Sequence, residues 1–325
     1  DERSAAGTIY QLIKIVHHQI VGECDRVAFG YTIGHAKLRC GVDLQRLGRG
    51  RGGVGHWDTH LGQTLSRPNL KKKCGAMVCA SSKGLGLGCA RALAAAGVDL
   101  VMNARGADAL EAAAAAIRAD FGVDVVTVAA DIAGAAGQAD VIKAAQGVDI
   151  LVTNAGGPPP GMWSDWDRDD FIAALDANML APIALMKALL PGMQKKGWGR
   201  VVNITSQSVK SPIAVLGLSN AARAGLTGYV AGTSRQVAPD GVTINNMLPG
   251  IHATDRAISL DTGVSTQQGI SMDEARAQRQ ATIPARRYGT ADEFGAMCAF
   301  LCSQHAGFIV GQNILLDGGA VNATL

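Results

Sequence analysis

Residues 218–225 read LSNAARAG, and two polar side chains, Ser219 and Arg223, stand among the small residues of this stretch. Their i, i+4 spacing places both on one face of a helix. An arginine in such a place can hold hydroxyl groups and supply positive charge, but it essentially never releases its proton, and a serine has no useful acidity near neutral pH. The alternative is a helix N-cap followed by a surface arginine.

A glycine-rich stretch at 81–88 carries a second chemical signal. It reads SSKGLGLG, follows a short apolar run and opens an amphipathic pattern. Glycines there let the backbone turn tightly and approach a pyrophosphate, which a helix N-terminus attracts. We therefore predict a dinucleotide-binding loop, with a plain tight turn as the alternative. The predicted loop residues are Ser81, Ser82, Lys83, Gly84, Leu85 and Gly86.

The second apolar run ends in NARG, at 103–106. A carboxylate at this strand end would hold a ribose 2′-hydroxyl, whereas Ala104 and Arg105 suit a 2′-phosphate. Lys83 adds a second positive charge nearby. An arginine at a strand end is often only solvated, but two cations at one corner favour NADP(H) over NAD(H).

The elements that must position these residues follow from residue 75 onward, where apolar runs alternate with Ala-rich helical patterns. Such alternation predicts an α/β fold, a doubly wound Rossmann-type parallel sheet in a single domain over 71–325. The predicted strands are 76–80, 99–104, 124–129, 148–153, 200–205, 242–248 and 312–316. The predicted helices are 86–96, 107–120, 136–146, 169–190, 219–238 and 291–303.

Residues 1–70 have a different composition and no sustained period, and they hold five of the seven histidines. We expect an appended, poorly ordered segment ahead of the domain. Its cysteines and histidines (Cys24, Cys40, His56 and His60) lack the spacing of a zinc finger, so we expect no metal site.

Overall composition narrows the function classes. A net charge of +3 is too small to indicate a nucleic-acid surface. The seven cysteines form no regular framework, which favours a reduced, cytoplasmic setting. The most apolar helical stretch, at 109–119, is charged and too short to cross a membrane, and the N-terminus lacks the pattern of a signal peptide. A soluble cytoplasmic protein without nucleic-acid or membrane partners is expected.

Together, several motifs resemble the short-chain dehydrogenase/reductase family, in its 3-oxoacyl-[acyl-carrier-protein] reductase-like branch, from about residue 74 to 320. The landmarks are SSKGLG (81–86), Asp131, NAGG (154–157), Asn178, NITS (203–206), LPG (248–250), Thr254 and GQNILLDGG (311–319). Two positions depart from the family pattern: Ala80 replaces the first loop glycine and Cys79 replaces a threonine.

The resemblance implies roles for the cofactor-binding residues. Asp131 and Ile132 would contact the adenine. The remaining contacts would come from Asn154, Ala155 and Gly156 along the nucleotide, and from Pro249, Gly250 and Thr254 beside the nicotinamide.

In the family a serine orients the carbonyl, a tyrosine polarised by a lysine donates the proton, and a helix asparagine completes the relay. Here the serine is Ser206 and the asparagine is Asn178. Counting 13 residues from Ser206 reaches Ser219 in place of the tyrosine, and four more reach Arg223 in place of the lysine. The resemblance implies that Arg223 faces the nicotinamide ribose. Tyr229, ten residues after Ser219, lies on another face, so the usual relay is absent.

A substitute acid is offered by Lys210, four residues after Ser206 in TSQSVKSP. The sequence is similar to an atypical branch that pairs SVK with LSNxxR. A lysine in a desolvated setting releases its proton more readily, so Lys210 can take the place of the tyrosine; the alternative is a solvated loop lysine. His252 is a second candidate, or equally a loop histidine.

Some residues that could contact the substrate can be predicted from the sequence. The stiff loop GGPPPG (156–161) precedes Trp163 and Trp166, which either face substrate or cover the next helix. Residues 255–285 stand where the family keeps a mobile lid, and Arg256 near its start is compatible with an anionic or carboxylated substrate. We predict an NADP(H)-dependent oxidoreductase acting on a small-molecule carbonyl or alcohol. The alternatives are a catalytically silent NADP(H)-binding sensor and a non-redox enzyme on the same scaffold.

The two long predicted helices, 169–190 and 219–238, have Ala- and Gly-rich faces that permit close packing. The family resemblance implies that they assemble the chain into a homo-oligomer, a tetramer or a dimer.

Overall fold

The computed structural model describes residues 74–323, which contain a seven-stranded sheet in the order β3-β2-β1-β4-β5-β6-β7. Every neighbouring pair is parallel. The strands are β1 (Gly75–Val78), β2 (Asp99–Ala104), β3 (Val125–Ala129), β4 (Ile150–Thr153), β5 (Gly199–Ile204), β6 (Val242–Pro249) and β7 (Asn313–Leu316). The predicted α/β class and doubly wound parallel sheet are confirmed. The predicted segment 1–70 and its boundary lie outside the described residues.

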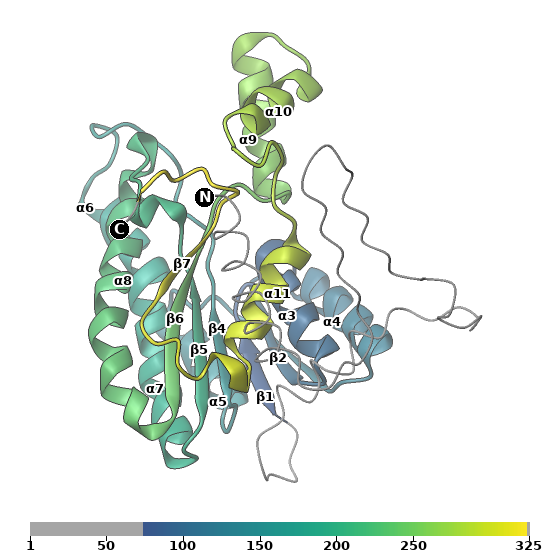
Figure 1. Ribbon diagram of the computed structural model, residues 1–325, viewed down its shortest axis with the longest axis vertical. Helices are drawn as coiled ribbons and strands as arrows, with labels where there is room; N and C mark the ends of the chain where they lie inside the picture. Colours follow the sequence, from purple (N-terminus) through teal and green to yellow (C-terminus); the bar gives the residue numbers. More distant parts are fainter. Residues whose placement is uncertain (1–73, 324–325) are drawn as a thin grey trace, which may run out of the picture. The chain divides into compact units, whose positions relative to one another are not determined.

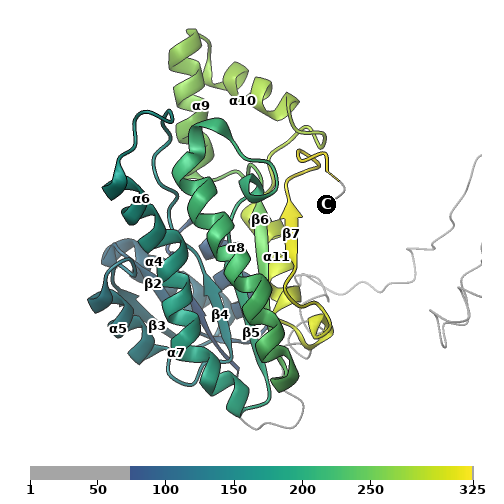
Figure 2. The same ribbon diagram turned by 90° about the vertical axis from the view of Figure 1, so that its left-hand side faces the viewer.

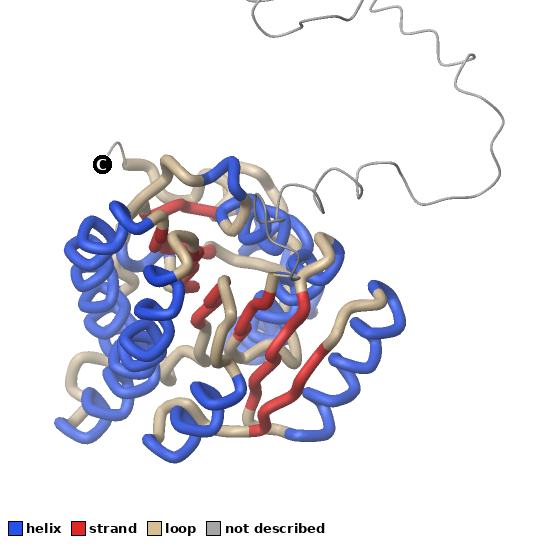
Figure 3. Tube along the Cα trace, turned by 90° about the horizontal axis from the view of Figure 1, so that it is seen from below, coloured by secondary structure: helices blue, strands red, loops and turns tan. Residues whose placement is uncertain are grey.

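Helices cover both faces of the sheet (Figures 1 and 3). On one face lie α3 (Gly84–Ala95), α4 (Ala107–Phe121) and α11 (Ala291–Leu301), and on the other α5 (Ala135–Ala144), α7 (Ala181–Lys195) and α8 (Gly217–Val237). Alternate residues of β1 enter the two cores, Ala76 and Val78 on one side and Met77 on the other, where Cys79, the next residue after the strand, joins it. Burial on both faces explains why the strands read as continuous apolar runs.

The predicted helix 169–190 is one continuous helical run from Arg168 to Lys195, made of α6 (Arg168–Leu175), a π-helical turn η2 (Asp176–Leu180) and α7. By length and composition this run could cross a membrane, which the sequence pattern did not single out. Its apolar side chains Leu185, Met186 and Met193 are fully buried in the core beside the sheet, however. The apolar composition of this run is therefore that of a helix that packs in the protein core.

Two helices, α9 (Asp255–Gln268) and α10 (Met272–Ala281), follow β6 beyond the carboxyl end of the sheet (Figures 1 and 2). A single carboxylate holds them together, because buried Asp261 accepts hydrogen bonds from Arg279 of α10 and from the Tyr288 hydroxyl, the latter at 2.7 Å. Burial and this hydrogen bond raise the pKa of Tyr288 to about 12. The segment predicted as a lid, residues 255–285, thus contains two helices joined by these contacts, and its mobility stays a prediction. We call residues 255–281 the lid.

Short helical turns complete the connections between the main elements. They are η3 (Gln207–Val209), η4 (Ala214–Leu216), η5 (Ala238–Asp240) and η6 (Gln304–Ala306).

Candidate active site

The sequence-predicted site residues gather at the carboxyl edge of the sheet. Strand order reverses beside β1, which pairs with β2 on one side and β4 on the other. In doubly wound sheets ligands bind at such a switch point. The loops after β1 to β6 begin at this edge and carry most of the predicted cofactor-binding residues, whereas Asn178 lies in η2 and Ser219 and Arg223 lie in α8.

The glycine loop joins β1 to α3. Gly84 has a φ of 58°, and a Cβ on Gly86 would lie 2.2 Å from the Ala80 carbonyl oxygen, so both positions need glycine. Gly88 serves packing instead, since its Cβ would lie 2.3 Å from the Ala291 carbonyl oxygen of α11. No side chain caps the start of α3 and no acidic residue occupies its first turn. Its free N–H groups and positive dipole end therefore remain available to a phosphate.

Of the polar loop residues, only some can face a ligand. The Ser81 side chain is fully buried and donates to the Asn103 carbonyl oxygen at 3.3 Å, so its role is to fasten the loop to β2. Ser82 and Leu85 are half-buried. Exposed Lys83 forms an ion pair with Asp255 of the lid at 2.8 Å, which lowers the pKa of that carboxyl. Lys83 is thus paired with the lid, and its predicted contribution to 2′-phosphate binding, beside that of Arg105, stays a prediction.

Ala80 has a φ of 46°, a left-handed conformation that suits glycine. Replacing Ala80 with glycine is expected to raise the free energy of unfolding by about 0.5–1 kcal/mol, the relieved strain less the extra chain entropy. Thermal denaturation measures it. The matched control, Ala112→Gly in the exposed interior of α4, should shift stability the other way. If both variants lose stability equally, Ala80 carries no strain.

The adenine side lies at the ends of β2 and β3. Arg105 is exposed directly after β2, and Asp131 is exposed while Ile132 is buried. The Asp131 carboxylate accepts a hydrogen bond from the Ala133 N–H at 3.0 Å. Asn103, which the sequence reading did not assign, donates to the carbonyl oxygens of Val128 and Ala130. This amide sets the spacing of the two strand ends that flank the predicted adenine pocket.

The residues predicted to flank the nicotinamide lie in segments 154–156 and 249–254. A Cβ on Gly84 would lie 3.6 Å from the Thr254 methyl group, and one on Gly86 would lie 3.0 Å from the Asn154 amide nitrogen. Gly250 donates to the Leu316 carbonyl oxygen at 2.8 Å, and a Cβ there would meet Asp317. The structure therefore brings the glycine loop, Asn154 and Thr254 together. Ala155, Gly156 and Pro249 lie on the same loops and are partly or fully accessible.

Arg223 is buried, with 8% of its surface exposed. Its Nε donates to the Ser219 hydroxyl oxygen at 3.1 Å, and its Nη1 donates to the carbonyl oxygens of Ile204 at 2.9 Å and Thr205 at 2.8 Å. Its Nη2 makes one long bond, 3.5 Å, to the Ala155 carbonyl oxygen. Arg223 is thus an internal clamp on the end of β5, and only its Nη2 edge has donors to spare.

Burial, and secondarily the nearby positive charge of Arg256, lower the pKa of Arg223 to about 10. The guanidinium remains charged at neutral pH. The surface-arginine alternative is therefore wrong. The contact of Arg223 with the nicotinamide ribose stays a prediction, and the Nη2 edge is the part of the side chain that has a donor for it. Ser219 is also buried, and its oxygen is used by Arg223, so it is a positioning residue for that guanidinium.

Asn178 lies in the π-helical turn η2, an irregularity that often occurs at functional sites. Its side chain is buried and donates to the Ala174 carbonyl oxygen at 3.3 Å, while its Oδ1 has no partner among the described residues. A buried acceptor without a partner favours a bound water or ligand there. Gln207, which the sequence reading missed, also has a buried side-chain oxygen without a partner and lies beside Gly250. Only its place next to Ser206 could have signalled it.

Ser206 and Lys210 flank the short helix η3. The half-buried Ser206 hydroxyl oxygen accepts a hydrogen bond from the Ser208 N–H at 3.1 Å, which fixes the oxygen and leaves the hydroxyl proton free. Lys210 ends η3 with an exposed side chain. The residues around it do not desolvate it, so a bound cofactor and substrate would have to do so.

No other described side chain takes the place of the missing tyrosine. Tyr229 packs against the core and Tyr288 donates to Asp261. His252 is buried edge-on to Phe294, with ring centroids 5.2 Å apart, and its Nδ1 lies 3.3 Å from the Gly250 carbonyl oxygen. Burial lowers the pKa of His252. Its contacts show a packing role rather than an acid facing the site.

Within residues 74–323 no cluster of three or more histidine, cysteine or acidic side chains has the geometry of a metal site.

Comparison with known proteins gives consistent matches. A family model described as enoyl-(acyl carrier protein) reductase matches residues 79–321. The NADPH-dependent reductase BacG of Bacillus subtilis is 30% identical over 253 residues, 76% of this chain and 98% of BacG. D-beta-hydroxybutyrate dehydrogenase of Cupriavidus necator is 33% identical over 253 residues, 76% of this chain and 97% of that enzyme. The solved L-sorbose reductase from Gluconobacter frateurii, complexed with NADPH and L-sorbose, matches with a TM-score of 0.75 at 26% identity, over 78% and 98% of the two chains.

Proposed function

The chain belongs to the short-chain dehydrogenase/reductase family, and from this premise we propose a hydride transfer between NADP(H) and a carbonyl or alcohol substrate through an altered proton relay. The chain is an NADP(H)-dependent oxidoreductase acting on CH–OH and C=O groups. The single observation that carries the proposal is the uncapped N-terminus of α3, which follows β1 at the same edge of the sheet at which Ser206 follows β5.

NADPH supplies the hydride when it is bound. The N–H groups at the start of α3 would hold its pyrophosphate, and Thr254 and Gly250 would flank its nicotinamide. The Ser206 hydroxyl, fixed by Ser208, would donate to the substrate carbonyl oxygen and orient it. The buried charge of Arg223 would stabilise the negative charge that develops on that oxygen.

Proton delivery has to differ from the family pattern. We propose that Lys210 gives its proton to the alkoxide oxygen once substrate and cofactor exclude water from its ammonium group. Asn178 Oδ1 would hold a water molecule behind the site through which a proton can be replaced. The support for this assignment is the short span between Ser206 and Lys210 along η3 and the burial of Ser219.

The buried Ser219–Arg223 pair also favours a second candidate, a silent NADP(H)-binding protein. NADPH oxidation with a panel of ketones, aldehydes and quinones separates the two, on protein whose NADPH binding has been verified. Binding without turnover of any compound would overturn the enzymatic proposal and favour the silent one.

Cofactor choice is expected to depend on Arg105, which is exposed directly after β2. Arg105→Asp should weaken NADPH binding by about 2–3 kcal/mol, because a charged hydrogen bond to the 2′-phosphate is replaced by repulsion. Titration of NADPH and NADH against both proteins measures this. The NADH affinity serves as the control and should change little. Tighter NADH than NADPH binding in the unmodified protein would refute the assignment.

We also propose a homo-oligomer, a dimer or tetramer, joined through the run Arg168–Lys195 and α8. On that run Phe171, Ile172 and Leu180 are exposed, and a shallow groove is lined by Leu180, Ile183, Ala184, Lys187 and Ala188. Light scattering should give two or four times the chain mass of 33.5 kDa, and Leu180→Arg should lower it. A single-chain mass at micromolar concentration would contradict this.

We also propose a cytoplasmic location, because all five described cysteines are free thiols, as is typical of a reducing compartment.

A further inference from the structure

Two arginines from different elements converge on one short loop, residues 154–157. Arg223 of α8 reaches the Ala155 carbonyl oxygen with its Nη2. Arg256, the second residue of α9, lies against Gly157, since a Cβ placed there would be 2.4 Å from its Nη1. The loop that follows β4 therefore has a guanidinium from the sheet side and another from the lid.

Neither guanidinium forms an ion pair with a carboxylate in residues 74–323. The four hydrogen bonds of Arg223 go to a hydroxyl and three carbonyl oxygens, all uncharged. Asp255 precedes Arg256 but pairs with Lys83 across the glycine loop. The other acid of α9, Asp261, is held by Arg276, Arg279 and Tyr288. Both acids of α9 are therefore engaged elsewhere, and Arg256 has no carboxylate partner among the described residues.

Two like charges beside a partly buried loop repel each other, and burial makes the repulsion stronger than in water. The two guanidinium groups flank neighbouring residues of the same loop, Ala155 and Gly157, and the positive charge of Arg256 acts together with burial to lower the pKa of Arg223. An arrangement of this kind is stabilised when an anion enters between or beside the two groups. Arg256 is exposed, and Gly157 without a side chain leaves its fork accessible from the loop.

The cofactor is a poor source for that anion. Its pyrophosphate is assigned to the start of α3 and its 2′-phosphate to the end of β2, while its nicotinamide end carries no negative charge. Only the substrate remains. A planar carboxylate matches the two parallel N–H donors of a guanidinium.

Resting on the proposed function, we propose that Arg256, with the Nη2 edge of Arg223 behind it, binds the carboxylate of an oxo-acid or hydroxy-acid substrate. Ser206 holds the reacting oxygen at the other end of the molecule. The class of substrate is therefore a carbonyl or alcohol compound that bears a carboxylate.

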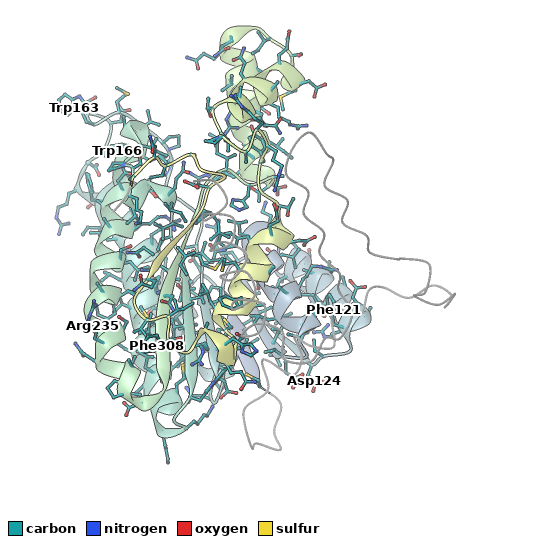
Figure 4. The ribbon with its side chains drawn as sticks, in the orientation of Figure 1. Phe121, Asp124, Trp163, Trp166, Arg235 and Phe308 are labelled. Carbon is teal, nitrogen blue, oxygen red and sulfur yellow. The ribbon has the colours of Figure 1, made fainter. Side chains whose placement is uncertain are left out.

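The two tryptophans that follow this loop take different positions. Trp163 is 85% exposed on the loop after β4 (Figure 4). Trp166 lies against Gly217 at the start of α8 and meets Phe171 of α6 edge-on, so it covers these two helices.

The experiment compares Arg256→Gln with the unmodified enzyme on 2-oxo, 3-oxo and 4-oxo acids, each beside its methyl ester. We expect the KM of at least one acid to rise about 10- to 100-fold, because a charged hydrogen bond to its carboxylate is lost. The KM of the corresponding methyl ester should not change. Affinity for NADPH should stay within about twofold. The control is Arg235→Gln, at the far end of α8 (Figure 4), which removes the same charge and should leave the KM of acids and esters unchanged.

Three outcomes overturn the inference while leaving the proposed function standing. They are an equal loss for acid and ester, a parallel loss of NADPH affinity, and an unmodified enzyme that uses only esters. Calorimetric titration of the same oxo acids into NADP⁺-loaded protein tests it without turnover. Binding of an acid that Arg256→Gln removes would sustain the carboxylate site even if the enzyme proved silent, and no binding and no turnover of any acid would refute it.

Discussion

Replacing Arg223 with alanine is expected to lower the free energy of unfolding by about 3 kcal/mol and to weaken NADPH binding about 10- to 100-fold. The stability loss arises because the variant leaves the buried carbonyl oxygens of Ile204 and Thr205 without donors and opens a cavity beside Ser219. In a domain of this size the melting temperature should fall by about 6–12 °C. Affinity falls because the ends of β4 and β5, which Arg223 ties together, line the predicted nicotinamide site.

Two matched variants distinguish an internal clamp from a ligand contact. Ser219→Ala removes one neutral acceptor and should cost about 1 kcal/mol or less, with little change in NADPH affinity. Arg223→Lys keeps the charge, but one ammonium cannot reach both strand carbonyls and Ser219, so its stability should lie between those of the other proteins. If the Arg223→Ala protein keeps both its melting temperature and its NADPH affinity, Arg223 neither stabilises the end of β5 nor contributes to cofactor binding.

The same geometry explains why restoring Ser219 to tyrosine should not recreate the usual relay. Position 219 is buried and its oxygen lies 3.1 Å from Arg223 Nε. A phenol there would have to displace the guanidinium from the end of β5. Ser219 and Arg223 therefore behave as one unit, and a change at either position has to be compensated at the other.

The fold could be predicted from the sequence because a strand buried on both sheet faces is a continuous apolar run, and this pattern recurs in each βα unit. Boundaries were less legible where backbone conformation decides them. The run 76–80 ends as a strand at Val78 because the chain turns through a positive φ at Ala80. The helix predicted from residue 86 begins at Gly84, and the one predicted over 169–190 contains a π-helical turn at Asn178.

The site was predicted by residue type, and what escaped prediction was which partner each side chain selects. Lys83 bonds Asp255, 172 positions away, and this pairing depends on where the lid lies. Arg223 is held by backbone carbonyl oxygens, which every residue carries and no sequence pattern marks. Gly88 looked like part of a phosphate loop, but its neighbour is α11. Such contacts join residues that are far apart in the sequence, so the spacing of neighbouring residues cannot predict them.

Lys210→Ala is expected to lower kcat/KM for carbonyl reduction about 10²-fold or more, the usual contribution of a general acid, while NADPH affinity stays nearly unchanged. Lys210 is exposed at the end of η3, so its removal should leave the melting temperature within about 1 °C. Stopped-flow NADPH oxidation and cofactor titration measure the two effects separately.

The matched control is Lys143→Ala, an exposed lysine in the last turn of α5, which should retain full activity. If Lys210 is the acid, the pH profile of kcat/KM should also lose its basic limb in the Lys210→Ala protein, because no group remains whose deprotonation stops the reaction. A solvated loop lysine would leave both rate and profile intact. In that case the proton has to come from water, and the buried Asn178 Oδ1 is the group positioned to hold that water, so Asn178→Ala should then show the rate loss assigned here to Lys210.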